Sequence, residues 1–335
     1  MKEALYYRGE EDGSVTCSLC PHNCHVKPGK RGVCRVRKNI DGHLFSENYG
    51  LVTASHLDPV EKKPLYHYFP GSAIMSIGSF GCNLHCKFCQ NAEISQSCLS
   101  DLPNLSDYSP GDILQMALSA GGNIGVAYTY NEPAIWFEYM MDVARLVKNN
   151  QLKNVMVTNG FINQEPLLEL MPWVDAFSVD LKAFTDDFYR KVTGSRLQPV
   201  LDTLETISKA KRHLEITNLV IPGLNDDIKI FRDMCRWIQT NLGRETVLHL
   251  SRYFPTYKMT IESTPIDTLT HLYDVAKEFL DYVYIGNVHL SKGRDTTCSK
   301  CGRTVMRRDG YWTSTSGLDT NGRCIVCGNQ VAVME

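Results

Sequence analysis

Three cysteines stand close together in the stretch Cys82-Asn83-Leu84-His85-Cys86-Lys87-Phe88-Cys89, directly after an apolar run. Three neighbouring thiolates at a C-x3-C-x2-C spacing suit a [4Fe–4S] cluster and leave one of its four irons without a protein ligand. An open iron can hold a small molecule, so this spacing favours chemistry over a purely structural role. The alternative is a zinc knuckle with His85 or Cys98 as its fourth ligand.

Eight of the other cysteines form two further groups of four. The first group is Cys17, Cys20, Cys24 and Cys34, and the second is Cys298, Cys301, Cys324 and Cys327. Cys98 and Cys235 remain outside these groups. Short C-x2-C spacings without a secretory signal indicate metal binding more than disulfides. We therefore predict three metal sites.

The N-terminal group places four thiols within eighteen residues, around a Cys20-Pro21-His22-Asn23-Cys24 core. Such a group can close a tetrahedral zinc site or hold a second iron–sulfur cluster. Spacing alone does not separate the two metals, and zinc is slightly preferred. Four protein ligands would saturate either centre, which favours a structural or electron-relay role. His22 and His25 are possible substitute ligands, but we expect each at the surface beside the loop, and the cations Arg31, Arg35, Arg37 and Lys38 on a solvated face.

The C-terminal group consists of two C-x2-C-Gly knuckles, Cys298–Gly302 and Cys324–Gly328. Each glycine lets backbone amides turn towards the thiolates. This spacing predicts a zinc ribbon, with rubredoxin-type iron as the lesser alternative. We expect it to be structural, or to dock a partner or substrate.

Length and composition limit the classes of protein to which this chain can belong. The chain has 335 residues, 43% of them hydrophobic, and a net charge of −2. These values predict a large α/β domain with appendages and give no electrostatic case for nucleic acid as a partner. No stretch approaches the roughly 18–20 apolar residues of a membrane span. The polar start, Met1–Glu10, is unlike a secretory signal, so we expect a cytoplasmic protein.

The middle of the chain alternates apolar runs with amphipathic stretches such as Ala134–Lys148. Repeats of this kind predict βαβ units, a parallel sheet, and a full or partial barrel with its active site at the carboxyl ends of the strands. We predict a Cys-rich segment at residues 1–66, a barrel at 67–295 and a ribbon at 296–335. The strand candidates are Ile74–Gly78, Ile124–Tyr130, Asn154–Thr158, Ala176–Leu181, His213–Ile221, Val247–Tyr253 and Tyr282–Gly286.

Polar motifs follow successive predicted strands. Thr129–Pro133 ends the second strand, Thr158–Gly160 the third and Asp180–Lys182 the fourth, while Arg252 lies on the sixth. Each motif alone is weak, because Asn-Gly and similar pairs are ordinary turn residues. An apolar strand has no structural need for such a cluster at its exit, so their joint placement predicts a binding site.

The cysteine stretch, including Phe88 before its last thiol, resembles the signature of the radical SAM superfamily. Residues 65–290 resemble its pyruvate formate-lyase activating enzyme branch, which uses a partial (β/α)6 barrel. The resemblance implies an open iron chelated by S-adenosylmethionine, and reductive cleavage to a 5′-deoxyadenosyl radical that abstracts hydrogen. It also implies cofactor contacts: Asp180 and Lys182 to the methionine part, Thr129, Asn131 or Glu132 to the amino group, and Asn159 to the ribose or methionine part. Arg252 is a candidate partner for the carboxylate.

The chain as a whole is similar to the AmmeMemoRadiSam system radical SAM enzymes. The residues that carry this likeness include Cys17-x2-Cys20-Pro21-His22-x-Cys24, Asp58-Pro59-x-Glu61-x-Lys63-Pro64-Leu65 and Tyr128-Thr129-Tyr130-Asn131-Glu132-Pro133. The likeness implies a reductant such as ferredoxin or flavodoxin and an association with AMMECR1-like and Memo-like proteins. The substrate would be a small molecule or a protein, and a glycyl-radical enzyme activase is the main alternative. An iron–sulfur electron carrier and a multi-zinc binding protein are the non-enzymatic alternatives.

Overall fold

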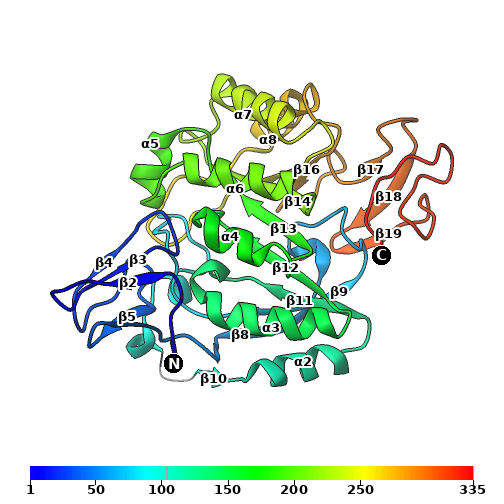
Figure 1. Cartoon of the computed structure of the whole chain (residues 1–335). Coiled ribbons are helices and arrows are strands. Elements are labelled where there is room, and N and C mark those ends of the chain that lie inside the picture. The colour runs from blue at the N-terminus through cyan, green and yellow to red at the C-terminus, as the bar shows by residue number, and fades with distance from the viewer. Residues whose placement is uncertain (103–104, 335) are drawn as a thin grey trace.

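A sheet of eight strands forms the centre of the protein (Figure 1), seen in a computed structural model that describes residues 1–102 and 105–334. Neighbouring strands follow almost the order of the chain, and all pairs are parallel except β8 with β9. The order is β16 (Val283–Gly286), β15 (Val247–Arg252), β14 (His213–Val220), β13 (Ala176–Asp180), β12 (Lys153–Thr158), β11 (Asn123–Tyr128), β9 (Ala73–Gly78) and β8 (Ala54–Pro59).

The parallel part confirms all seven predicted strands, each within two residues of the expected ends. A strand that is buried on both faces has a nearly continuous apolar sequence, and these seven strands have such sequences. Because β8 and β16 form the two edges, the sheet is a partial barrel and stays open. The edge strand β8 pairs antiparallel with β9 and comes from the predicted Cys-rich segment.

Helices return the chain between parallel strands. They are α1 (Ala92–Ser95), α2 (Pro110–Ser119), α3 (Phe137–Asn149), α4 (Gln164–Leu170), α5 (Asp186–Phe188), α6 (Gln198–Lys209), α7 (Ile228–Asn241) and α8 (Ile266–Lys277). Their starts use side-chain caps: Ser109 accepts from the Asp112 amide before α2, and Asp227 from the Ile230 amide before α7. The apolar stripe of α3, including Tyr139, Met140, Val143 and Val147, is buried as predicted.

Small antiparallel sheets form the N-terminal part, drawn in blue in Figure 1. One has the order β1 (Lys2–Glu3), β6 (His43–Ser46), β5 (Arg37–Ile40), the second the order β2 (Tyr7–Gly9), β3 (Val15–Cys17), β4 (His25–Val26), and a third pairs β7 (Leu51–Val52) with β10 (Ser106–Asp107). Cys17, Leu19 and Cys20 share one hydrophobic core with the barrel. The N-terminal part is therefore packed onto the barrel.

Arg37 corrects one expectation from the sequence. Its side chain does not lie on a solvated face, because the residue is only 1% exposed. The guanidinium pairs with the carboxylate of Glu138 in α3, and its Nη1 donates to the Leu5 carbonyl at 2.8 Å. A cation so buried needs such partners, since desolvation of an unpaired charge is costly.

The C-terminal strands β17 (Thr296–Thr297), β18 (Thr304–Asp309) and β19 (Trp312–Ser314) lie on the opposite side of the molecule (Figure 1). The Val333 amide donates to the His67 carbonyl at 2.8 Å, and the Phe69 amide donates to the Val333 carbonyl at 2.8 Å. His67 also bridges the Val331 carbonyl and the Tyr284 hydroxyl, each at 2.6 Å. These hydrogen bonds hold the C-terminal part against the barrel.

None of the helices in the described ranges has the length and apolar character needed to cross a membrane.

Candidate metal and cofactor site

The loop that carries Cys82, Cys86 and Cys89 follows directly after β9. Gly81 precedes the first thiol with φ at +80°, where a Cβ would lie 2.6 Å from the Cys34 carbonyl oxygen. Only glycine fits this close approach in the left-handed region. Asn131, at the exit of β11, ties the loop down: its Oδ1 accepts from the Ser79 amide at 3.1 Å, and its Nδ2 donates to the Gly81 carbonyl at 3.0 Å.

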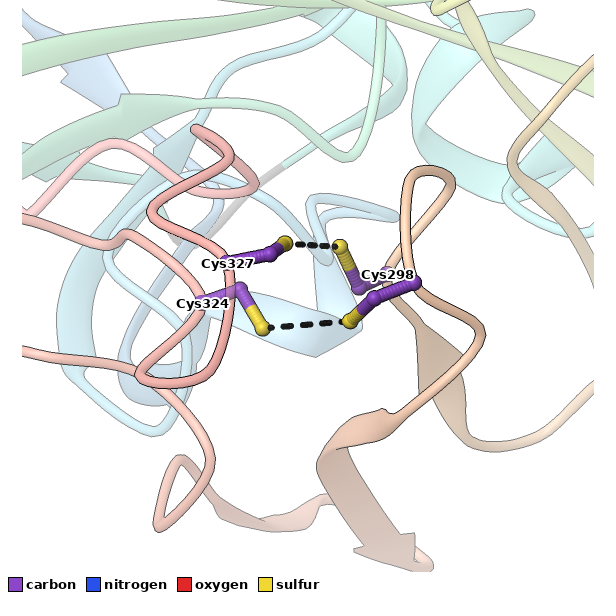
Figure 2. Close-up of side chains that lie close together, drawn as sticks. Cys298, Cys324 and Cys327 are labelled. Atoms are coloured by element: carbon purple, nitrogen blue, oxygen red, sulfur yellow. Dashed lines mark hydrogen bonds between the residues drawn. The ribbon is translucent and has the colours of Figure 1, made fainter.

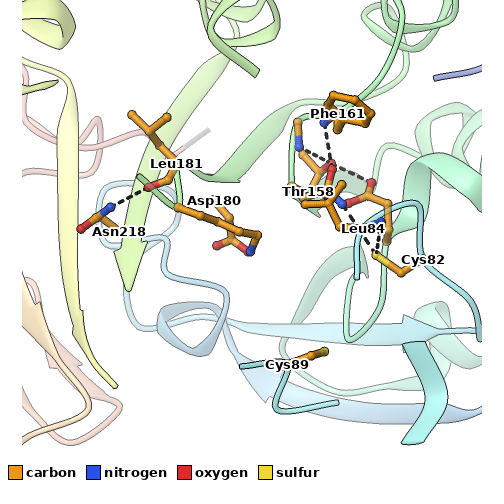
Figure 3. A network of polar contacts seen from close by, with 12 residues as sticks. Cys82, Leu84, Cys89, Thr158, Phe161, Asp180, Leu181 and Asn218 are labelled. Atoms are coloured by element: carbon orange, nitrogen blue, oxygen red, sulfur yellow. Dashed lines mark hydrogen bonds and ion pairs between the residues drawn. The ribbon is translucent and has the colours of Figure 1, made fainter. Parts of the chain in front are cut away.

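Two of the three thiols, Cys82 and Cys89, have neighbouring groups that can donate hydrogen bonds to a thiolate. The Leu84 amide lies 3.3 Å from Cys82 Sγ (Figure 3), and Asn159 Nδ2 lies 3.8 Å from the same sulfur. Ser95 Oγ is 3.1 Å from Cys89 Sγ. Burial raises the pKa of Cys82 well above its usual value. Thiolates here therefore require compensation by hydrogen bonds and by a bound metal. This donor set fits an iron–sulfur cluster, whose ligand sulfurs accept such bonds.

Asp180 and Lys182 form an ion pair at the exit of β13, with Lys182 Nζ 2.9 Å from Asp180 Oδ2. The ammonium lies beside Cys86 and 5.7 Å from the centroid of the Phe88 ring. Burial disfavours the Lys182 cation, but Asp180 and Cys86 outweigh it and raise its pKa. The Asp180 side chain is 37% exposed, so its carboxylate can reach a ligand.

Glu132 is buried beneath this site. Its carboxylate accepts from the Asn159 amide at 2.8 Å, the Ala134 amide at 2.9 Å and the Thr158 hydroxyl at 2.7 Å. Burial raises its pKa to about 7, although these three donors favour the anion. Glu132 thereby positions Asn159, whose Nδ2 faces Cys82; direct contact of Glu132 with a cofactor stays a prediction.

Asn83 was not singled out in the sequence, and it links the loop to β12. Its Oδ1 accepts from Asn159 Nδ2 at 2.9 Å, and its Nδ2 donates to the Phe161 carbonyl at 2.7 Å. An asparagine between two cysteines gives no sequence signal for this role. The exits of β9, β11 and β12 are thus joined by hydrogen bonds, part of which Figure 3 shows, and the exit of β13 approaches the same loop through Lys182, 5.7 Å from the Phe88 ring centroid.

Thr129 and Arg252 lie outside these contacts. Thr129 is buried just after β11, and its amide donates to the Ile77 carbonyl at 2.9 Å. Arg252 ends β15, where its Nε donates to the Thr264 carbonyl at 2.9 Å and its guanidinium lies 4.9 Å from the Phe254 ring centroid. Their roles towards a cofactor stay predictions.

The two candidate fourth ligands of a zinc knuckle have other partners. His85 Nδ1 lies 2.7 Å from Gln96 Oε1. The Cys98 thiol lies 3.2 Å from Ser100 Oγ and 3.1 Å from an Asp101 carboxylate oxygen. These contacts favour a site held by Cys82, Cys86 and Cys89 alone.

The C-terminal cysteines face one another from two loops (Figure 2). All four sulfurs of Cys298, Cys301, Cys324 and Cys327 lie within 4.8 Å of one another. The Cys298–Cys327 pair is 3.5 Å apart and the Cys301–Cys324 pair 3.6 Å. One zinc ion with tetrahedral bonds of about 2.3 Å would set its sulfurs about 3.8 Å apart, so this group can hold a single metal ion.

In the N-terminal group, Cys17, Cys20 and Cys34 are buried and Cys24 is half-buried. Arg37 Nη1 lies 3.5 Å from Cys17 Sγ, and the Val33 amide 3.5 Å from Cys24 Sγ. Both are donors to sulfur, as thiolate ligands require.

Comparison with known proteins gives consistent matches. The pattern of the radical SAM superfamily matches residues 76–235. The chain is 39% identical to an uncharacterized protein of Methanocaldococcus jannaschii over the full length of both. It is 22% identical to the pyruvate formate-lyase 1-activating enzyme of Escherichia coli over 44% of this chain and 61% of that protein. A radical SAM methyltransferase from Sphaerobacter thermophilus has a similar fold, with a TM-score of 0.52, 14% identity, and coverage of 65% of this chain and 67% of that one.

Proposed function

This chain belongs to the radical SAM superfamily and is related to glycyl-radical activating enzymes, and from that premise we propose that it cleaves S-adenosylmethionine reductively. A [4Fe–4S] cluster with S-adenosylmethionine bound supplies a 5′-deoxyadenosyl radical, which removes hydrogen from a substrate. Cys82, Cys86 and Cys89 would hold the cluster. The substrate is a small molecule or a protein.

The observation that carries this proposal is the convergence of four strand exits on the three thiols. The Leu84 amide and Asn159 Nδ2 donate to Cys82, and the Lys182 ammonium offsets charge at Cys86. Asp180, paired with Lys182 and partly exposed, can accept from the amino group of the cofactor's methionine part. Asn131 fixes the entry of the loop, so the thiols keep their places when a ligand binds.

We also propose the finer assignments. The chain would be an AmmeMemoRadiSam system enzyme that acts in the cytoplasm and takes electrons from a ferredoxin or flavodoxin, with AMMECR1-like and Memo-like proteins as partners. The order of its sequence motifs supports this assignment. Zinc would occupy the C-terminal ribbon, because paired sulfurs at 3.5 and 3.6 Å match one tetrahedral ion.

The test is anaerobic turnover. The full chain is reconstituted with iron and sulfide, S-adenosylmethionine and dithionite are added, and 5′-deoxyadenosine is quantified. We expect product from the natural sequence and from Cys98→Ala, whose thiol hydrogen-bonds to Ser100 and Asp101, and none from Cys86→Ala. A reducible cluster without product would favour an electron carrier. Zinc without any cluster would favour a binding protein.

A glycyl-radical activase is the second candidate, and the likeness to the pyruvate formate-lyase 1-activating enzyme favours it. An activase removes hydrogen from a glycine of a second protein chain. It therefore predicts that 5′-deoxyadenosine forms in step with a glycyl radical on a protein substrate, seen by electron paramagnetic resonance. Product matched by a hydrogen-depleted small molecule would exclude it.

A further inference from the structure

The N-terminal thiols lie directly against the loop of the catalytic thiols. A Cβ on Gly81 would lie 2.6 Å from the Cys34 carbonyl oxygen, so the two backbones touch, and Cys82 is the next residue. The path from the Cys34 Cα to the Cys82 Cα is therefore short. It consists of the Cys34 carbonyl, one van der Waals contact to Gly81 and one peptide unit of about 3.8 Å. Val36 and Phe80 pack together with Cys34 in the same small core.

A second contact joins the same two loops. His22 lies between Cys20 and Cys24, and its Nε2 is 2.7 Å from the carbonyl oxygen of Asn83, which follows Cys82. Since a carbonyl only accepts, Nε2 carries the proton. His22 also packs edge-on against Phe161, with ring centroids 5.0 Å apart. A continuous path of covalent and hydrogen bonds thus runs from Cys20 to Cys82.

The spacing of the N-terminal sulfurs differs from that of the C-terminal group. Among Cys17, Cys20, Cys24 and Cys34, every set of three sulfurs contains a pair more than 4.8 Å apart. A single zinc ion would draw all pairs to about 3.8 Å. A [4Fe–4S] cluster places each sulfur on its own iron and therefore spreads them. The catalytic thiols Cys82, Cys86 and Cys89 share this wider spacing.

The surroundings also suit a buried anionic centre. Arg37 is 1% exposed and directs Nη1 at Cys17 Sγ. The Val33 amide donates to Cys24 Sγ. Hydrogen bonds to the sulfurs and nearby charge are the features through which a protein tunes the potential of such a cluster.

We infer that Cys17, Cys20, Cys24 and Cys34 hold a second [4Fe–4S] cluster, which passes electrons to the catalytic cluster across the His22–Asn83 and Cys34–Gly81 contacts. This inference rests on the proposed function. A reduced protein of the ferredoxin or flavodoxin class gives up one electron, and the second cluster goes from the 2+ to the 1+ state. It returns to 2+ when that electron moves to the catalytic cluster. With four protein ligands it has no open iron, so it binds no S-adenosylmethionine.

The first experiment isolates the second site. The full chain with Cys82→Ala, Cys86→Ala and Cys89→Ala is reconstituted anaerobically, and iron, sulfide and zinc are measured. We expect about four irons and four sulfides per chain, and a reduced-cluster resonance that S-adenosylmethionine does not change. Zinc at the N-terminal site with no iron would overturn the inference. This count does not depend on catalysis, so absence of 5′-deoxyadenosine from the natural sequence would overturn the proposed function alone.

The second experiment tests the electron path. His22→Phe keeps an aromatic ring against Phe161 but removes the bond to Asn83, and His22→Gln restores an N–H donor. With reduced flavodoxin as donor, we expect single-turnover 5′-deoxyadenosine formation to slow several-fold in His22→Phe and to recover in His22→Gln. The exposed His25, mutated to Phe in the same loop, is the matched control. Equal rates in His22→Phe and His25→Phe, with iron content unchanged, would refute the relay.

Discussion

Replacing Glu138 by leucine should destabilise the protein far more than replacing a half-buried glutamate whose lysine partner is exposed. Arg37 and Glu138 are 1% and 2% exposed, and Glu138 Oε1 also accepts from the Leu5 amide at 2.8 Å. Removing one partner of a buried ion pair costs about 3–5 kcal/mol, because the other charge stays buried without compensation. Glu205, paired with the exposed Lys209, is the matched control and should cost about 0.3–0.5 kcal/mol.

The expected shift in melting temperature follows from the size of the chain. Unfolding entropy near 60 °C is about 2.1 cal/mol/K per residue, or about 0.7 kcal/mol/K for this protein. Glu138→Leu should therefore lower Tm by about 4–7 °C and Glu205→Leu by less than about 1 °C. Scanning calorimetry of the reconstituted protein under anaerobic conditions measures both.

A double variant makes the reasoning refutable. Arg37→Met with Glu138→Leu removes both charges, and the Leu5 backbone that loses its partners belongs to an exposed residue that water can reach. The double variant should be at least as stable as Glu138→Leu, since replacing a whole buried pair by apolar groups is often nearly neutral. If its loss of Tm equals the sum of the two single losses, the pair is not coupled and the argument fails.

Three further predictions concern the site and the C-terminal contact. Lys182→Met should weaken S-adenosylmethionine binding about 10- to 100-fold in equilibrium dialysis without changing iron content, because one charge-assisted contact is lost. Lys209→Met, at an exposed position that ends α6, should leave this binding unchanged. Gly81→Ala should melt about 1–4 °C below Gly223→Ala: both have positive φ, but only the Cβ at Gly81 meets Val36 and Cys34 atoms, at 2.5 and 2.6 Å. Burial lowers the pKa of His67 to about 4, so its contribution to stability is complete above about pH 6.5 and falls as the pH drops towards 4. At pH 5 this loss is about 2 kcal/mol, so His67→Gln should lose about 3 °C less between pH 8 and pH 5 in calorimetry.

Each of these has a result that contradicts it. Unchanged cofactor affinity in Lys182→Met would remove that cation from the binding site. Equal Tm values for the two alanine variants would mean that the backbones at Cys34 and Gly81 can move apart without loss of stability. A pH dependence that is the same with and without His67 would show that this histidine does not titrate on unfolding.

The sheet could be predicted from the sequence because its strands are local patterns. Seven apolar runs separated by amphipathic stretches are enough to indicate a parallel sheet. The edge strand β8 gave no such pattern: His56 and Leu57 are exposed, and Asp58 and Pro59 follow. The prediction that Arg37 lies on a solvated face was wrong for a related reason. Its partner Glu138 lies 101 positions away, and no local sequence pattern indicates that the two residues pair.

The site was predictable to the extent that cysteine spacing is local. C-x3-C-x2-C and C-x2-C-Gly predict candidate ligands without any knowledge of the fold, and for the C-terminal group the structure brings the four sulfurs together. The contacts that join the Cys17–Cys34 segment to the Cys82–Cys89 loop are long-range, since His22 lies 61 positions from its partner Asn83. Such a pair follows only from how β8 and the N-terminal sheets pack on the barrel, which no short motif encodes.

The bond from His67 to Val331 has a consequence for the order of events on the ribosome. The two residues are 264 positions apart, so at about 5–20 residues per second the histidine is made roughly 13–50 s before its partner. Cys82, Cys86 and Cys89 are synthesised within that interval, before the bonds of Val333 to His67 and Phe69 can form. The contact between His67 and Val331 can therefore form only after Cys82, Cys86, Cys89 and every strand of the central sheet have been synthesised.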